Sequence, residues 1–159
     1  MRTRAAQALD LLGVPYDLLE FEPEQFTARE AAERLGLPLE QVFKTLVVRA
    51  DDGRVMLACV PAAEELNLKT LARLVGAKRV EMAAAADLKR LVGYIKGAVS
   101  PLGSRRPHPV YLDAAALRHA RVSVSAGVRG LQLWIDPRDL VRATGARVAA
   151  LTEPGSAAR

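Results

Sequence analysis

The sequence predicts a single compact domain of the mixed α/β (α+β) class, and three observations support this fold class. The chain has 159 residues, which is about the length of one domain with a single sizeable core. Half of its residues are hydrophobic and 26% are charged, an ordinary globular mixture. Short strand-like segments alternate irregularly with helix-like segments, and no internal repeat or domain boundary is visible. We therefore expect one domain over residues 1–151 and a frayed tail over residues 152–159.

Helices are expected where apolar residues recur at helical spacing between a capping residue and a glycine. Thr27 and Glu30 fit a capping box, and Pro137 suits a first helical position. In chain order, the expected helices occupy residues 2–12, 27–36, 67–76, 83–91 and 137–145.

Strands are expected where β-branched and aromatic residues cluster between turn signals. The turn "DDGR" joins two strands into a hairpin, because Gly53 can adopt a positive φ. Residues 93–109 are too rich in glycine and proline for a regular element, but apolar residues recur in them, so we expect an ordered loop. In chain order, the expected strands occupy residues 16–21, 42–50, 55–60, 78–82, 110–113, 122–126 and 131–135.

Composition restricts the class of protein. The formal net charge of +5 and the pI of about 9.8 favour a polyanionic partner. A single cysteine excludes a disulfide within the chain and fits a reducing compartment. The sequence has neither a secretory signal nor a membrane-spanning stretch, so we expect a cytoplasmic protein without a membrane partner.

The usual catalytic constellations are missing. His108 and His119 lack the spacing of metal ligands, and neither a phosphate-binding loop nor a serine-nucleophile elbow is present. Cys59 lies in an apolar run with nothing beside it to lower its pKa, so we expect a small core residue rather than a nucleophile. We expect no metal and no other cofactor.

Three features remain as candidates for a site. Lys44 interrupts "VFKTLVV", either as an edge-strand lysine with its amine in water or as a fixed positive charge at the rim of a pocket. The stretch "GAVSPLG" fits a nest of backbone amides that binds an anion, or an ordinary turn in which Ser100 bonds its own backbone. The stretch "VSAGVRG" places Ser125 and Gly127 at the end of a sheet, or simply forms a hairpin.

Four motifs taken together favour a functional interpretation of these features over an ordinary structural one. They are "QVFKTLVV", "GAKRVEMA", "GYIKGAVSPLG" and "VSAGVRGLQLWIDPRDL". In this order and spacing, from Ala5 to Leu151, they resemble the YbaK/EbsC family, the stand-alone relatives of the editing insertion domain of bacterial prolyl-tRNA synthetase. The resemblance implies a curved mixed sheet flanked by helices. It also implies hydrolysis of the ester that joins a wrong amino acid to the 3′ end of tRNA, usually cysteine on tRNA(Pro), with alanine removed by a related branch.

The resemblance also assigns roles to residues. It implies catalytic roles for Lys44, Gly97 and Ser100, and substrate contacts for Thr45, Ala98, Ser125, Gly127 and Gln132. Basic residues beside these motifs are expected to contact the acceptor stem of a mischarged tRNA, and they are Lys96, Arg105, Arg106 and Arg129.

Two positions depart from the family pattern. Many members have two glycines where this chain has Gly97 and Ala98, which is tolerable if only the first residue needs an unusual φ. Gln132 stands where the well-studied branch has an acidic residue, so we expect a neutral acceptor in place of a carboxylate that binds the α-ammonium of the substrate. The match near Phe26 and Thr27 is loose.

The absence of a triad fits the implied reaction, because an aminoacyl ester is already activated and needs placement and charge stabilisation. Lys44 would anchor the terminal phosphate, and the thiol of a cysteinyl substrate would attack its own carbonyl and leave as a thiolactone. The alternatives are a deacylase for alanine or another small residue, a non-catalytic module that binds tRNA or a synthetase, and a general RNA-binding protein. Prolyl-tRNA synthetase is the expected protein partner.

Overall fold

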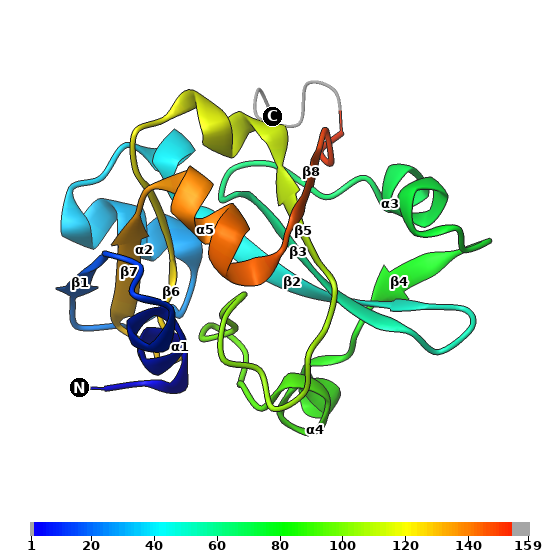
Figure 1. The fold of residues 1–159 in the computed structure, drawn as a ribbon, viewed down its shortest axis with the longest axis horizontal. Helices are drawn as coiled ribbons and strands as arrows, with labels where there is room; N and C mark the ends of the chain where they lie inside the picture. The colour runs from blue at the N-terminus through cyan, green and yellow to red at the C-terminus, as the bar shows by residue number, and fades with distance from the viewer. Residues whose placement is uncertain (1, 154–159) are drawn as a thin grey trace.

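The structure is a computed structural model that describes residues 2–153, and it belongs to the mixed α/β class, as predicted (Figure 1). The α-helices of this part of the chain are α1 (Arg4–Leu12), α2 (Ala28–Leu35), α3 (Leu68–Val75), α4 (Leu88–Val92) and α5 (Pro137–Thr144). The strands are β1 (Asp17–Glu20), β2 (Phe43–Ala50), β3 (Val55–Pro61), β4 (Val80–Met82), β5 (Val110–Asp113), β6 (Val122–Ser125), β7 (Leu131–Ile135) and β8 (Arg147–Ala149). None of these helices is long and apolar enough to cross a membrane.

The strands form two sheets. The larger has the order β4-β2-β3-β5-β8, with antiparallel pairs around β2 and parallel pairs around β5. The smaller is antiparallel with the order β1-β7-β6. A single parallel bridge between Val42 and Ser123 joins the start of β2 to β6, so the two sheets meet at this point.

Local sequence signals mark the first and last turns of most helices, as expected. Threonine, asparagine and aspartate side chains accept N-terminal amides, and glycines in the left-handed region follow the last turn. The segment expected as a helix over residues 83–91 is a 3₁₀ turn, Ala85–Asp87, followed by the single short helix α4. Two further 3₁₀ turns, Leu39–Gln41 and Ala114–Arg118, and the strand β8 were not predicted.

The first two residues of the predicted tail, Thr152 and Glu153, contact the domain. Thr152 forms an isolated bridge with Leu66, and the backbone N–H of Glu153 donates to the carbonyl of Glu65 at 3.0 Å. These two residues are therefore attached to the domain, contrary to the prediction. Residues 154–159 lie outside the described residues.

Two apolar clusters cover opposite faces of the larger sheet. Val47, Leu57 and Cys59 point into the cluster shared with the smaller sheet, and Val48 and Met56 point into the cluster beneath α3. Because side chains alternate along a strand, Lys44 emerges on the same face as Val48. Cys59 is fully buried in the core, as predicted.

Candidate active site

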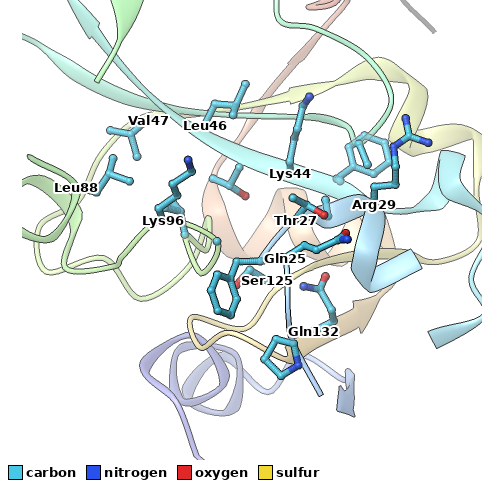
Figure 2. Close-up of a pocket in the computed structure, with 18 of the residues that line it drawn as sticks. Gln25, Thr27, Arg29, Lys44, Leu46, Val47, Leu88, Lys96, Ser125 and Gln132 are labelled. Carbon is cyan, nitrogen blue, oxygen red and sulfur yellow. The ribbon is translucent and has the colours of Figure 1, made fainter. Parts of the chain in front are cut away.

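A cavity of about 640 Å³ lies along one edge of β2. Its lining residues come from five segments of the chain, 21–29, 43–47, 82–88, 96–99 and 125–132, together with Ala62 (Figure 2). Segments far apart in sequence thus converge on one space. Several residues singled out in the sequence line it: Lys44, Thr45, Lys96, Gly97, Ser125 and Gln132.

The cavity exists because β2 is only partly paired on this edge. β4 pairs with Val48–Ala50 and stops there. The carbonyl of Val47 still accepts a hydrogen bond from the amide of Ala83 on the side away from β3. Backbone groups two residues apart on a strand face the same edge, so the N–H and C=O of Thr45 also face this side, where no strand pairs with them among residues 2–153. The cavity therefore meets an open sheet edge.

Lys44 sits on this open part of β2 and is half-buried. Burial is the main cause that lowers the pKa of Lys44, and Arg29 acts in the same direction, whereas Glu65 and Glu64 oppose the shift. Both interpretations of the lysine hold in part, because it is an edge-strand residue and it lines a cavity. Arg29, Lys44 and Lys96 line this cavity without any aspartate or glutamate among the described lining residues. Such a site favours an anionic ligand.

The rim of the cavity is built from the loop before α2. Phe26 has φ +59°, and no other residue of the described chain except glycine has a positive φ. Its ring lies beneath the guanidinium of Arg129, 3.8 Å from the ring centroid. A side chain of this size in the left-handed region is strained, so the surrounding structure must hold it there.

Glu30 holds this loop. The buried carboxylate accepts hydrogen bonds from the backbone amides of Glu24, Gln25 and Phe26 at 2.9–3.1 Å, and from Arg34 Nε at 3.2 Å. Burial alone raises the pKa of Glu30, but the hydrogen bonds from these amides and from Arg34 outweigh it and lower the pKa below its usual value. The capping box is thus only half formed: Thr27 Oγ accepts from the Glu30 amide at 3.1 Å, while the Glu30 carboxylate serves the loop instead.

Gly97 packs directly against Phe26. It has φ +85°, and a Cβ at this position would lie 2.7 Å from Phe26 Cβ and 2.8 Å from the Phe26 carbonyl oxygen. Ala98 does not have a positive φ, so only the first residue of the pair needs the unusual conformation. The departure from two glycines is therefore tolerated by the backbone.

The other predicted residues of this loop do not reach the cavity. Ser100 is fully buried, and its Oγ accepts a hydrogen bond from the Leu102 amide at 3.3 Å within its own turn. Ala98 is also buried, and its amide donates to the Ile95 carbonyl at 3.0 Å. The Ser100 hydroxyl therefore bonds within an ordinary turn, and neither Ser100 nor Ala98 is among the residues that line the cavity.

The last residue of β6, Ser125, contributes to the cavity, but Gly127 in the turn after it does not. Ser125 Oγ accepts from the Gly127 amide at 3.1 Å and lines the cavity. Gly127 has φ +98° and faces the ring of Tyr94, which would lie 2.7 Å from an added Cβ. Tyr94 in turn donates from its hydroxyl to the Leu102 carbonyl. The contact between Gly127 and Tyr94 therefore packs the two loops against each other, and neither residue lines the cavity.

Gln132 lines the cavity, and its side-chain oxygen already accepts one hydrogen bond. Ser123 Oγ, which is fully buried, donates to Gln132 Oε1 at 2.6 Å. This separation is typical of O–H···O and shorter than the usual range for N–H···O, so the oxygen of the amide faces Ser123. Ser123 therefore uses one of the two lone pairs of Oε1, and the neutral acceptor for the α-ammonium stays a prediction.

The predicted tRNA-contacting residues fall into two groups. Lys96 lines the cavity, and Arg129, which does not, covers the ring of the lining residue Phe26 and donates from Nε to the Lys96 carbonyl at 3.0 Å. Arg105 and Arg106 are exposed, and neither lines the cavity. The sequence did not indicate that Arg29 lines the cavity or that Glu30 holds its rim, and it gave no role to Phe26. The capping pattern already accounted for Glu30, and no motif marks the strained loop. Among residues 2–153, no three His, Cys, Asp or Glu side chains are grouped so as to hold a metal ion.

Comparison with known proteins bears on this site. Residues 22–143 match the family model of the aminoacyl-tRNA editing domain. The chain is 35% identical over 153 residues to EbsC of Enterococcus faecalis, named as a candidate Cys-tRNA(Pro)/Cys-tRNA(Cys) deacylase, with 95% of this chain and 93% of EbsC covered.

Two further similarities involve proline charging. The chain is 32% identical over 108 residues to the proline–tRNA ligase of Shouchella clausii, covering 68% of this chain and 19% of that enzyme. A crystal structure described as a candidate trans-editing enzyme for prolyl-tRNA synthetase matches with a TM-score of 0.86 and 32% identity, covering 94% of this chain and 95% of that one.

Proposed function

Because the chain belongs to the aminoacyl-tRNA editing domain family, we propose that it hydrolyses mischarged tRNA in trans, with Cys-tRNA(Pro) as the first candidate substrate. One observation carries the proposal beyond the family. A cavity large enough for the end of an aminoacylated nucleotide is lined by three cations and no carboxylate among the described residues. A tRNA 3′ end brings phosphate charge to such a site.

Lys44 anchors the phosphate of the terminal nucleotide in this proposal. Its ammonium is half-buried, so an ion pair there is less screened by water than one on the surface. The aminoacyl ester then lies between the open backbone of Thr45 and Ser125, both of which line the cavity. Amide and hydroxyl donors at these positions can stabilise the negative charge that develops on the carbonyl oxygen. Ser100 has a positioning role, because it holds the turn that carries Gly97.

The nucleophile comes from the substrate or from water. For a cysteinyl ester, the substrate thiol attacks its own carbonyl, the acyl–oxygen bond breaks, and the ribose oxygen takes a proton. Cys59 plays no part, since it is fully buried and burial raises its pKa to about 12 against the lowering effect of Thr45. The partner that selects the tRNA is prolyl-tRNA synthetase in this proposal.

The test is ester loss from purified Cys-tRNA(Pro), Ala-tRNA(Pro) and Pro-tRNA(Pro), with wild type, Lys44→Ala and the exposed control Lys69→Ala. Loss of a charge-assisted contact of about 1.5–3 kcal/mol corresponds to a decrease in kcat/KM of about 10- to 150-fold. We expect this decrease for Lys44→Ala and none for Lys69→Ala. Faster loss of Ala-tRNA(Pro) than of Cys-tRNA(Pro) would assign the enzyme to alanine. No ester loss above the uncatalysed rate would favour a non-catalytic binding module.

A further inference from the structure

The cavity does not contain the group expected to recognise the α-ammonium of an aminoacyl ester. No carboxylate lines it among residues 2–153, and the cationic side chains of Arg29, Lys44 and Lys96 do. Glu64 and Glu65 act on Lys44 electrostatically, but neither belongs to the cavity lining. A positively charged α-nitrogen therefore enters a site with three like charges and no opposite one on its walls.

Gln132 also brings a hydrogen-bond donor to the cavity, besides the acceptor that was expected. Its Oε1 accepts from Ser123, and its Nε2 makes no hydrogen bond among the described residues. No buried side-chain nitrogen or oxygen in the described chain lacks a partner, so Nε2 is accessible from the cavity that Gln132 lines. In the view of Figure 2, Gln132 and Ser125 lie in the lower part, and the charged ends of Arg29, Lys44 and Lys96 lie in the upper part. The Nε2 group of Gln132 can thus donate a hydrogen bond to an oxygen or to a neutral nitrogen of a substrate.

The open edge of β2 offers a complementary pair of groups. Thr45 presents one N–H and one C=O toward the cavity, without a paired strand among the described residues. A secondary amide carries the same pair of groups. An N-acyl group on the substrate can therefore meet Thr45 as an added strand meets an open sheet edge, and the Ser125 hydroxyl is then the donor left for the ester carbonyl.

From these three observations we propose that the site also accepts aminoacyl esters whose α-nitrogen is acylated, a substrate class without the ammonium charge. This proposal rests on the proposed editing function and extends its substrate class. In the reaction, water adds to the ester carbonyl, the acyl–oxygen bond breaks, and a proton from water passes to the ribose oxygen. The products are an N-acyl amino acid and tRNA with a free 3′ end.

The experiment compares tRNA(Pro) carrying cysteine, alanine, N-acetylcysteine or N-acetylalanine as substrates for the full chain. For whichever amino acid is removed faster, we expect kcat/KM for the N-acetyl ester to lie within about tenfold of that for the free amine, since no carboxylate of the described cavity lining loses a contact with the ammonium. A decrease of a hundredfold or more on N-acetylation overturns the proposal and leaves the editing function standing. Failure to cleave any of the four esters overturns both.

A variant pair tests the structural reason. Gln132→Glu keeps the length of the side chain and an oxygen for Ser123, but introduces a carboxylate into the cavity. We expect it to shift the preference toward the free amine by tenfold or more. The control Gln7→Glu makes the same charge change on the exposed face of α1, outside the cavity, and should not alter the ratio. Equal ratios for wild type, Gln132→Glu and Gln7→Glu would show that Gln132 does not determine this specificity.

Discussion

Replacing Gly97 with alanine tests the rim of the cavity. At φ +85°, an alanine pays the cost of the left-handed region, about 1–2 kcal/mol. Its methyl group would also lie 2.7 Å from Phe26 Cβ and 2.8 Å from the Phe26 carbonyl oxygen. Overpacking of this kind typically costs a further 1–3 kcal/mol, or about 2–5 kcal/mol in total.

The neighbouring loop has little freedom to move away. Phe26 is itself strained, its amide is bound by Glu30, and its ring lies beneath Arg129. Displacing Phe26 would therefore disturb bonds to the same carboxylate that holds Glu24 and Gln25. For this reason we expect the strain to appear both in stability and in the shape of the cavity.

Gly53→Ala is the matched control for Gly97→Ala. Gly53 has φ +91°, and an added Cβ would meet nothing within 4 Å. Its cost is conformational alone, about 1–2 kcal/mol. Urea unfolding measures the free energy of unfolding of both variants, and ester hydrolysis is measured where both remain folded. Equal losses of stability, or full activity in Gly97→Ala, would refute the idea that Gly97 is required for close packing against Phe26.

The remaining predictions concern charge, reactivity and the loop. Because burial lowers the pKa of Lys44, its positive charge is lost at a lower pH than that of an ordinary lysine. The rate of enzymatic ester loss, corrected for the uncatalysed rate, should therefore decline at a pH below the usual range of lysine pKa values. Lys44→Arg should move this decline to higher pH. Cys59 in the native protein should resist alkylation by iodoacetamide at mildly alkaline pH and react only when the protein is unfolded in urea, since burial raises the pKa of this thiol to about 12. Rapid alkylation of the folded protein would contradict the burial of Cys59. Glu30→Gln should speed amide hydrogen exchange at residues 24–26, because one amide oxygen replaces two carboxylate oxygens as the acceptor. The exposed control Glu33→Gln should leave this exchange unchanged, and equal protection in both variants would contradict the role of Glu30.

Elements with local signals were predicted from sequence, and elements held by distant partners were not. The helix Leu68–Val75 has its cap at Asn67 and its stop at Gly76, and both act within one turn of the backbone. By contrast, β8 is three residues long and is held by parallel pairing with β5, more than thirty residues earlier in the chain. Its sequence alone gives no period or turn that would mark a strand. The same reason explains why the meeting of two sheets at one bridge could not be predicted.

The site was predicted where a motif marks a residue and missed where packing decides its role. Lys44 could be singled out because a charge interrupts an apolar strand, but only the end of β4 shows that its edge is open. Ser100 lies within a recognisable motif, yet its hydroxyl is used inside its own turn. For Glu30, the sequence pattern correctly indicated a helix start but could not show that the carboxylate turns back to the preceding loop.

The strained conformation of Phe26 and the bonds of Glu30 have a common explanation. A non-glycine residue at φ +59° costs free energy and persists only where several interactions hold it. Here a buried carboxylate binds three successive amides, a guanidinium covers the ring, and Gly97 leaves room on the remaining side. These interactions place Phe26, a residue that is 39% exposed, at the rim of a cationic cavity. The N-cap bond of α2 joins the Glu30 amide to Thr27 Oγ and uses none of these interactions, so we assign the strain to the shape of the cavity and not to the start of the helix.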